Sequence, residues 1–158
     1  MESSATRVPV GAPSHLRHHR LVVVLALLFS VAIVATACAT PEEDSAVSMV
    51  NASRRAGGRT DLSSNVTLIL TAQVWSQQLA RDGKLSHRPS LSAGAPAGWR
   101  KLGENVGYGN SVAIVHNAFV KSAPHYANIM DPDFNSLGTG ITVDASGRRW
   151  EVQEFAAL

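Results

Sequence analysis

The sequence predicts one α+β domain, in which helices pack over a small antiparallel sheet, behind an N-terminal leader. Two helical segments precede residue 84, a third follows residue 110, and the last 24 residues form two strand-like segments joined by a turn. Helices followed by antiparallel strands are typical of this fold class. A chain of 158 residues is long enough for one such domain with appendages.

The clearest predicted element is a helix over residues 66–81. Ser64 or Asn65 can cap its start, and Gly83 can end it. Four residues at spacings of four, three and four share one helical face: Leu68, Ala72, Trp75 and Leu79. This face is expected to pack against the rest of the domain.

Two shorter helices are also predicted, one before this helix and one after the loop that follows it. Residues 47–55 form a helix that ends at Gly57 and Gly58, and residues 111–121 form another. The inner face of the later helix is expected to carry three residues: Val112, Val115 and Phe119.

The remaining segments predict a loop, a glycine-rich turn and a hairpin. Residues 84–102 are rich in Pro and Gly, and residues 103–109 contain too many glycines for a regular helix. The strands of the hairpin are expected at residues 138–144 and 149–155, with residues 145–148 as their connection. Pro124 and the Asp-Pro pair at 131–132 are expected to break the chain before the hairpin.

Residues 1–37 have the three parts of a secretory signal peptide. The first 20 residues are basic, with Arg7, Arg17 and Arg20 against one acid, and residues 21–37 are uncharged, apolar and end in small side chains. An uncleaved anchor is the alternative, although 17 apolar residues are fewer than the roughly 20 that span a bilayer. We therefore expect the domain to act outside the cytoplasm.

The leader also accounts for the net charge of the chain. It contains three of the 14 basic and one of the 12 acidic residues, so residues 38–158 hold 11 of each and are neutral. A neutral domain lacks the basic surface that nucleic-acid binding needs. No nucleic-acid partner is expected.

The single cysteine, Cys38, directly follows the predicted leader. It cannot form an internal disulfide, so the domain depends on its hydrophobic core. Residues 35–38 resemble a bacterial lipobox, although Ala35 stands where Leu is usual. We expect Cys38 to be lipidated, residues 38–46 to form a polar tether and residues 47–158 to form the domain. A stray cysteine beside an ordinary cleavage site is the alternative.

Two histidines and one glutamate are the candidate site residues. His87 and His125 each follow a predicted helix, and Glu104 lies in the glycine-rich turn. Together they could hold a divalent metal, hold a polar ligand, or form a structural network. The spacing alone favours the structural network. His116 lies off the inner stripe of its helix, so it is expected at the surface or at a boundary.

Four short strings follow one another in a characteristic order: LSH at 85–87, GEN at 103–105, FVKSAPH at 119–125 and WEVQEF at 150–155. In this order they resemble the CAP superfamily, also called the SCP or sperm-coating-protein-like domain, in its bacterial branch, and the resemblance extends from about Val47 to Phe155. It also includes Asn51, Arg54 and the GTG at 138–140.

This resemblance implies an α-β-α sandwich with a central antiparallel sheet and a cleft on one side. The family's cleft holds two His and two Glu, and some members bind zinc there. The motifs carry three of these positions onto His87, Glu104 and His125, whereas the fourth falls on Ser122. Because a hydroxyl is a poorer metal ligand than a carboxylate, this departure weakens the expectation of a zinc site.

Three functions follow as hypotheses. The first is an exported, membrane-tethered, non-catalytic binding module of the cell envelope for a lipid, sterol-like or cell-wall ligand. The second is a metal-assisted hydrolase of peptides or envelope polymers, in which His87 and His125 hold the metal and Glu104 is a ligand or general base. In the third, these residues only hold loops together, and removing one unfolds the domain.

Overall fold

The computed structural model describes residues 39–158. The predicted leader at residues 1–37 and Cys38 lie outside the described residues. Within the described part, no helix combines the length and the apolar character needed to cross a membrane.

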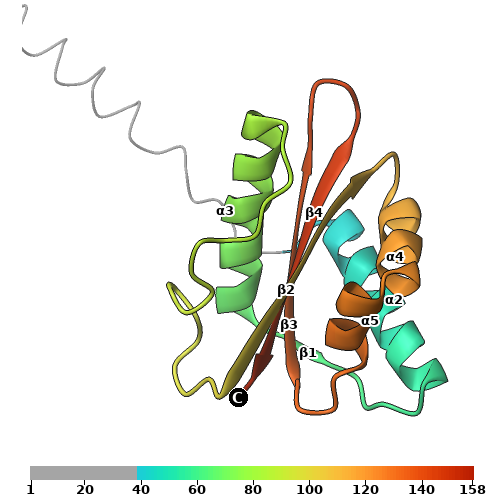
Figure 1. The fold of residues 1–158 in the computed structure, drawn as a ribbon, viewed down its shortest axis with the longest axis vertical. Helices are drawn as coiled ribbons and strands as arrows, with labels where there is room; N and C mark the ends of the chain where they lie inside the picture. Colours follow the sequence, from blue (N-terminus) through green and yellow to red (C-terminus); the bar gives the residue numbers. More distant parts are fainter. Residues whose placement is uncertain (1–38) are drawn as a thin grey trace, which may run out of the picture. The chain divides into compact units, whose positions relative to one another are not determined.

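Four strands form one mixed sheet in the order β1-β3-β4-β2 (Figure 1). They are β1 (Ser63–Ser64), β2 (Lys101–Gly109), β3 (Ser136–Val143) and β4 (Arg149–Ala157). The last two strands form the predicted antiparallel hairpin, and β2 pairs antiparallel with the other side of β4. The very short β1 pairs parallel with β3, so the sheet is mixed and not purely antiparallel as predicted.

Helices cover both faces of this sheet, which gives the expected α-β-α sandwich. On one face lies α3 (Val66–Asp82), which packs against β3 and β4. The other face carries α2 (Pro41–Ala56), α4 (Val112–Lys121) and α5 (Ala123–Met130) (Figure 1). The α+β fold class predicted from the sequence is confirmed.

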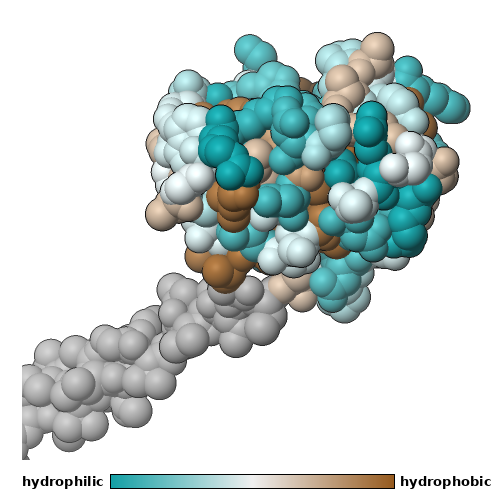
Figure 2. Space-filling model, turned by 90° about the horizontal axis from the view of Figure 1, so that it is seen from below, coloured by the Kyte–Doolittle hydropathy of each residue, from teal (hydrophilic) through white to brown (hydrophobic). Residues whose placement is uncertain are grey.

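A hydrophobic core lies on each side of the sheet. The core beneath α3 includes Trp150, Val152 and Leu79, and the opposite core includes Phe119, Phe155 and Val50. Burying such side chains stabilises a domain that has no disulfide. Seen from below, the surface is mainly hydrophilic, with hydrophobic side chains in narrow strips (Figure 2).

The best-predicted helices have the ends that the sequence indicates. The Asn65 side chain accepts hydrogen bonds from the first turn of α3, and Gly83 ends that helix with a φ of 62°. Ser111 caps α4, whose buried face contains all three predicted residues, Val112, Val115 and Phe119. Cap and stripe signals therefore located both helices correctly.

The predicted tether is corrected by the first described helix. Residues 41–46 belong to α2, because Thr40 and Glu43 form a capping box and Pro41 occupies the first turn. Ala46, on the inner face of this helix, is fully buried. A helix start resembles a polar linker in sequence, since both are rich in Pro and acidic residues.

The prediction of a turn at the glycine-rich segment is wrong. Residues 103–109 form most of β2, and its glycines allow close packing, since a side chain at Gly103 or Gly107 would meet Phe134 at 2.9 Å or Phe119 at 2.8 Å. The predicted break near Pro124 is present, because α4 ends at Lys121 and Ser122 is extended, but the sequence did not predict α5, which begins at once with Pro124 in its first turn.

Candidate functional site

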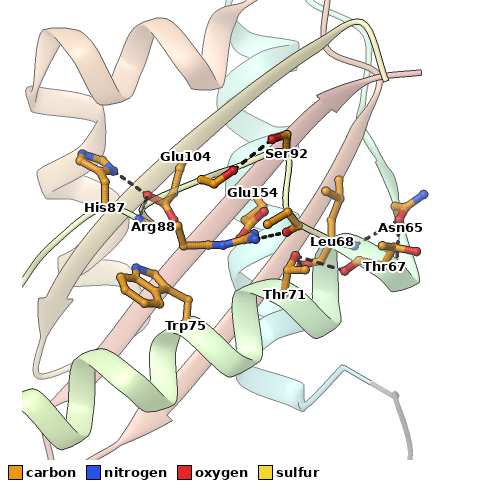
Figure 3. A network of polar contacts seen from close by, with 12 residues as sticks. Asn65, Thr67, Leu68, Thr71, Trp75, His87, Arg88, Ser92, Glu104 and Glu154 are labelled. Atoms are coloured by element: carbon orange, nitrogen blue, oxygen red, sulfur yellow. Dashed lines mark hydrogen bonds and ion pairs between the residues drawn. The ribbon is translucent and has the colours of Figure 1, made fainter. Parts of the chain in front are cut away.

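His87 and Glu104 form a close pair at the edge of the sheet that β2 forms. His87 lies in the loop after α3, and its Nδ1 is 2.6 Å from Oε1 of Glu104 on β2 (Figure 3). The main-chain N–H of Arg88 donates to the same oxygen at 3.1 Å. The His87 side chain is 62% exposed and that of Glu104 only 1%, so His87 covers a buried carboxylate.

Arg88 joins a second buried carboxylate to this pair. Glu104 and Glu154 are direct partners across β2 and β4, so their side chains share the face that α3 covers. The Arg88 guanidinium donates to Glu154 Oε1 at 2.5 Å and also to the carbonyl of Ala93 (Figure 3). Burial raises the pKa of Glu154, while the Arg88 charge opposes that rise and the charge of Glu104 adds to it.

His125 is held by the opposite helical layer. Its Nδ1 lies 2.9 Å from Oγ of Ser122, and its ring centroid is 5.0 Å from that of Phe119. Ser122 ends α4 and precedes α5, so it lies at the junction of the two helices. Burial lowers the pKa of His125, and the nearby His87 lowers it further. The neutral imidazole is therefore favoured at neutral pH.

Asn105, the last residue of the GEN string, ties β2 to α5. Its side-chain amide donates to the carbonyl of His125 at 3.2 Å and to Gln153 Oε1 at 3.1 Å. Asn128 in turn donates to Asn105 Oδ1 at 2.9 Å and to the Glu104 carbonyl at 3.1 Å. Asn105 is fully buried, so these bonds fix the position of His125 relative to the sheet.

A cleft of about 320 Å³ runs along β2 and ends at His125. Its walls are mostly apolar, as in many small-ligand sites. Two of its polar residues, Ser122 and His125, lie at the junction of α4 and α5. The residues that line it are Leu85, Val106, Gly107, Tyr108, Val115, Ala118, Phe119, Ser122 and His125.

The predicted metal ligands do not fit a zinc centre. A structural or catalytic zinc needs at least three protein ligands around one point. Among residues 39–158, no three His, Cys, Asp or Glu side chains come close enough to share a metal ion. Oε1 of Glu104 is already bound, and Nδ1 of His125 is bound to Ser122. One buried atom, Glu104 Oε2, has no hydrogen-bond partner among the described residues.

His116 is buried at a boundary between helices and not at the surface. It is 8% exposed, and its Nε2 lies 2.9 Å from Oγ of Ser53 on α2. Burial lowers the pKa of His116, which favours its neutral form. The residue therefore links α2 to α4 and lies outside the cleft.

Sequence reasoning missed Arg88, Glu154 and the apolar walls of the cleft. A signal for Glu154 was available, since it shares a strand face with Trp150 and Val152 and a buried carboxylate there requires a partner. Arg88 follows His87 directly, but a loop sequence does not reveal which strand its side chain reaches. The walls combine residues from three separate segments, which only the tertiary structure brings together.

A second, smaller hollow of about 220 Å³ lies on the outer side of α3, against Trp75 and Arg88. Two exposed hydrophobic residues of α3, Leu70 and Val74, line this hollow. Val66, four residues before Leu70, is a third exposed hydrophobic residue of the same helix. None of the predicted site residues lies in it.

Comparison with protein families gives a match to CAP, the cysteine-rich secretory protein family, over residues 47–155. Comparison with curated proteins gives no match. Among solved structures, an outer surface protein from Borrelia burgdorferi is similar with a TM-score of 0.67 and 17% identity, over 75% of this chain and 95% of that one.

Two other solved structures are similar over the same region. An extracellular SCP-domain protein from Bacillus anthracis has a TM-score of 0.64 and 19% identity, over 77% of this chain and 45% of that one. Venom allergen-like protein 4 from Schistosoma mansoni has a TM-score of 0.60 and 12% identity, over 75% of this chain and 89% of that one. At these identities the likeness concerns the fold alone.

Proposed function

Because the chain belongs to the CAP family of cysteine-rich secretory proteins, we propose that it is an exported, non-catalytic binding module of the cell envelope. Its ligand lies in the cleft between β2 and the junction of α4 and α5, and is a lipid, a sterol-like molecule or a cell-wall component. The observation that carries this proposal is the 320 Å³ apolar cleft with His125 and Ser122 at one end.

The arrangement of the polar residues supports binding over catalysis. Glu104 is buried under His87 and accepts two hydrogen bonds on one oxygen, so it is not aimed into the cleft as a free base. His125 faces a hydroxyl, Ser122, that has no further orienting base among its described contacts. Apolar walls with a few convergent polar groups are the usual design of a ligand pocket.

Export and anchoring rest on the leader and on the nature of the similar proteins. Two of the similar structures are described as an outer surface protein and an extracellular protein. Lipidation of Cys38 would hold the domain at the membrane through a short segment before Thr40. Mass spectrometry of the membrane fraction tests this: an intact leader or an unmodified Cys38 contradicts the anchor.

A cleft-filling variant tests the binding proposal. Ala118 is exposed and lines the cleft, so Ala118→Trp fills it, whereas Ala113→Trp places the same ring on an exposed part of α4 outside it. Residues 39–158 are incubated with phosphatidylethanolamine–phosphatidylglycerol vesicles, with sterol-containing vesicles and with insoluble peptidoglycan. We expect retention on one of these, lost in Ala118→Trp and kept in Ala113→Trp. Equal retention of both variants contradicts a ligand in the cleft.

The metal-assisted hydrolase has less support, because Ser122 replaces the second acid and the predicted ligands do not converge. Calorimetry with zinc addresses it directly. We expect no specific heat at a free zinc concentration of about 100 μM, where weak sites would still fill. A saturable heat that His125→Ala abolishes would favour the hydrolase.

A further inference from the structure

The register of the sheet determines which main-chain groups of β2 point away from β4. Ala157 on β4 accepts a hydrogen bond from the N–H of Arg100, whereas Ala156 accepts one from Asn135, on the side of β3. Odd-numbered residues of β4 therefore face β2, and even-numbered ones face β3. Since Gly103 pairs with Phe155 and Gly107 with Glu151, the odd-numbered residues of β2 bond to β4.

The even-numbered residues of β2 consequently direct their N–H and C=O groups outward. The Glu104 carbonyl confirms this direction, because it accepts a hydrogen bond from the Asn128 side chain. The next two outward-facing residues are Val106 and Tyr108. Among residues 39–158, no group donates to or accepts from their main chain on this side.

These free groups belong to residues that line the cleft. Val106, Gly107 and Tyr108 line it from β2, Leu85 lines it from the loop after α3, and Val115, Phe119 and Ser122 line it from α4 and its end. A strand edge with unpaired donors and acceptors is a template for another strand. Here that template is flanked by apolar walls that alternate side chains of an added strand could contact.

We propose that the cleft binds an extended peptide segment, which adds to the sheet as a strand beside Val106 and Tyr108. The peptide forms up to four main-chain hydrogen bonds with these two residues, and its alternate side chains contact the apolar walls. This inference rests on the proposed binding function and names the chemical class of its ligand.

The walls favour a single strand over a second copy of the domain. The loop at Leu85 and the α4–α5 junction enclose the edge from both sides. A strand that belongs to another folded domain carries its own helical layers, which would meet these walls. An isolated peptide carries none, and a cleft of about 320 Å³ accommodates only a short segment.

Nuclear magnetic resonance provides the test with a defined probe. The probe is the soluble heptapeptide Ac-Lys-Thr-Val-Thr-Val-Thr-Lys-NH₂, and its control is the same peptide with every internal amide N-methylated. We expect saturable shifts of the Val106 and Tyr108 amide signals with the probe and none with the control, which cannot donate. Absent or scattered shifts, or equal binding of the methylated peptide, would overturn the proposal.

A matched pair of variants isolates one hydrogen bond. Tyr108→Ala removes the ring but keeps the N–H, whereas Tyr108→Pro removes both. Proline is tolerated on an edge strand where its N–H would face outward. We expect Tyr108→Pro to bind the probe about five- to tenfold more weakly than Tyr108→Ala, the factor for one hydrogen bond. Equal affinities would overturn the proposal, and the methylated peptide keeps the test valid if the proline variant misfolds.

Three further outcomes relate this inference to the proposed function. Retention on vesicles or peptidoglycan that Ala118→Trp abolishes, without peptide binding, leaves the proposed function standing and overturns the peptide. Sedimentation that shows a dimer in the unaltered protein and a monomer in Tyr108→Pro reassigns the edge to a second copy. Peptide binding that Ala118→Trp abolishes supports the peptide and a ligand site in the cleft.

Discussion

The two edges of the sheet differ in the hydrogen bonding of their outward-facing main-chain groups. Along β3, two outward groups are bonded by segments outside the sheet's long strands: Asn65 donates to the Leu137 carbonyl, and the Glu43 carboxylate accepts from the Ile141 N–H. Along β2, the corresponding groups of Val106 and Tyr108 have no partner among the described residues. One edge is covered in part by the chain itself, whereas the part of the other edge that lines the cleft is left open.

This difference indicates which edge of the sheet is available to a ligand. Proteins usually close or blunt exposed edges, because an open edge invites pairing with other chains. The start of α2 and the short β1 cover part of the edge at β3. Within the cleft, the open edge comprises two residues, Val106 and Tyr108, and the cleft walls limit uncontrolled pairing there and leave access for one ligand.

The largest expected effect concerns the attachment of β3 to α3. A side chain at Gly140 would overlap the main chain between Ala72 and Gln73, which cannot move without displacing the helix. We expect Gly140→Ala to lower the free energy of unfolding by about 4 kcal/mol. Gly109→Ala is the control, because its nearest neighbour is a Val115 side-chain atom at 3.0 Å, which can shift. Urea denaturation of both variants measures the difference, and similar losses would contradict this account.

The next effect concerns the Glu43 carboxylate, which accepts a hydrogen bond at the β3 edge. Glu43 is 1% exposed and accepts from the Thr40 N–H at 2.7 Å, the Gln73 amide at 3.1 Å and the Ile141 N–H at 3.0 Å. Glu43→Ala leaves buried donors unpaired, so we expect a loss of about 3 kcal/mol in urea denaturation.

The neighbouring glutamate provides the control for this change. Glu42 forms a partly exposed ion pair with Arg149, and Glu42→Ala should cost less than about 1 kcal/mol. We also expect faster hydrogen exchange at Ile141 in Glu43→Ala alone. Unchanged protection at Ile141 would mean that Glu43 does not close the edge.

A pH-dependent effect is expected from Glu151, which lies on β4 between the two edges. Burial raises the pKa of Glu151 from 4.5 to about 7, and Oε2 of Glu151 has no partner among the described residues. Between these values the folded state binds the proton that the unfolded state releases. The free energy of unfolding therefore falls as the pH rises from 4.5 to about 7.

Glu151→Gln removes this titration. We expect the unaltered protein to lose about 3 kcal/mol more than the variant between pH 4.5 and pH 8. Urea midpoints at several pH values measure the two slopes. Because burial also raises the pKa of Glu154, both proteins retain some slope, and identical slopes would contradict the assignment to Glu151.

The local signals in the sequence were sufficient for most of the fold. Caps at Asn65 and Ser111 and the apolar stripe of α3 depend on neighbouring residues, so the sequence reveals them directly. The glycine-rich strand was misread, because its glycines serve close contacts with Phe119 and Phe134, which lie far away in sequence. Non-local packing overrode the local pattern there.

The candidate site was predictable as a set of residues but not as a geometry. The motifs named His87, Glu104, Ser122 and His125, and the structure joins them as two separate pairs, His87 with Glu104 and Ser122 with His125. The open edge of β2 depends on the register with β4, which no motif encodes. It therefore required the arrangement of the strands in three dimensions.

The smallest expected effect is a difference in stability between two variants at the far ends of β2 and β3. Tyr108 on β2 and Val143 on β3 are equally exposed, at 49%. The Tyr108 ring lies 5.1 Å from that of Trp150 and 4.6 Å from the Arg148 guanidinium, so Tyr108→Ala should cost about 1 kcal/mol. Val143→Ala should remain within about 0.5 kcal/mol of the unaltered protein. If thermal melts rank the two variants the other way, side-chain contacts do not hold the end of β2, and the open edge owes its position to the β4 ladder alone.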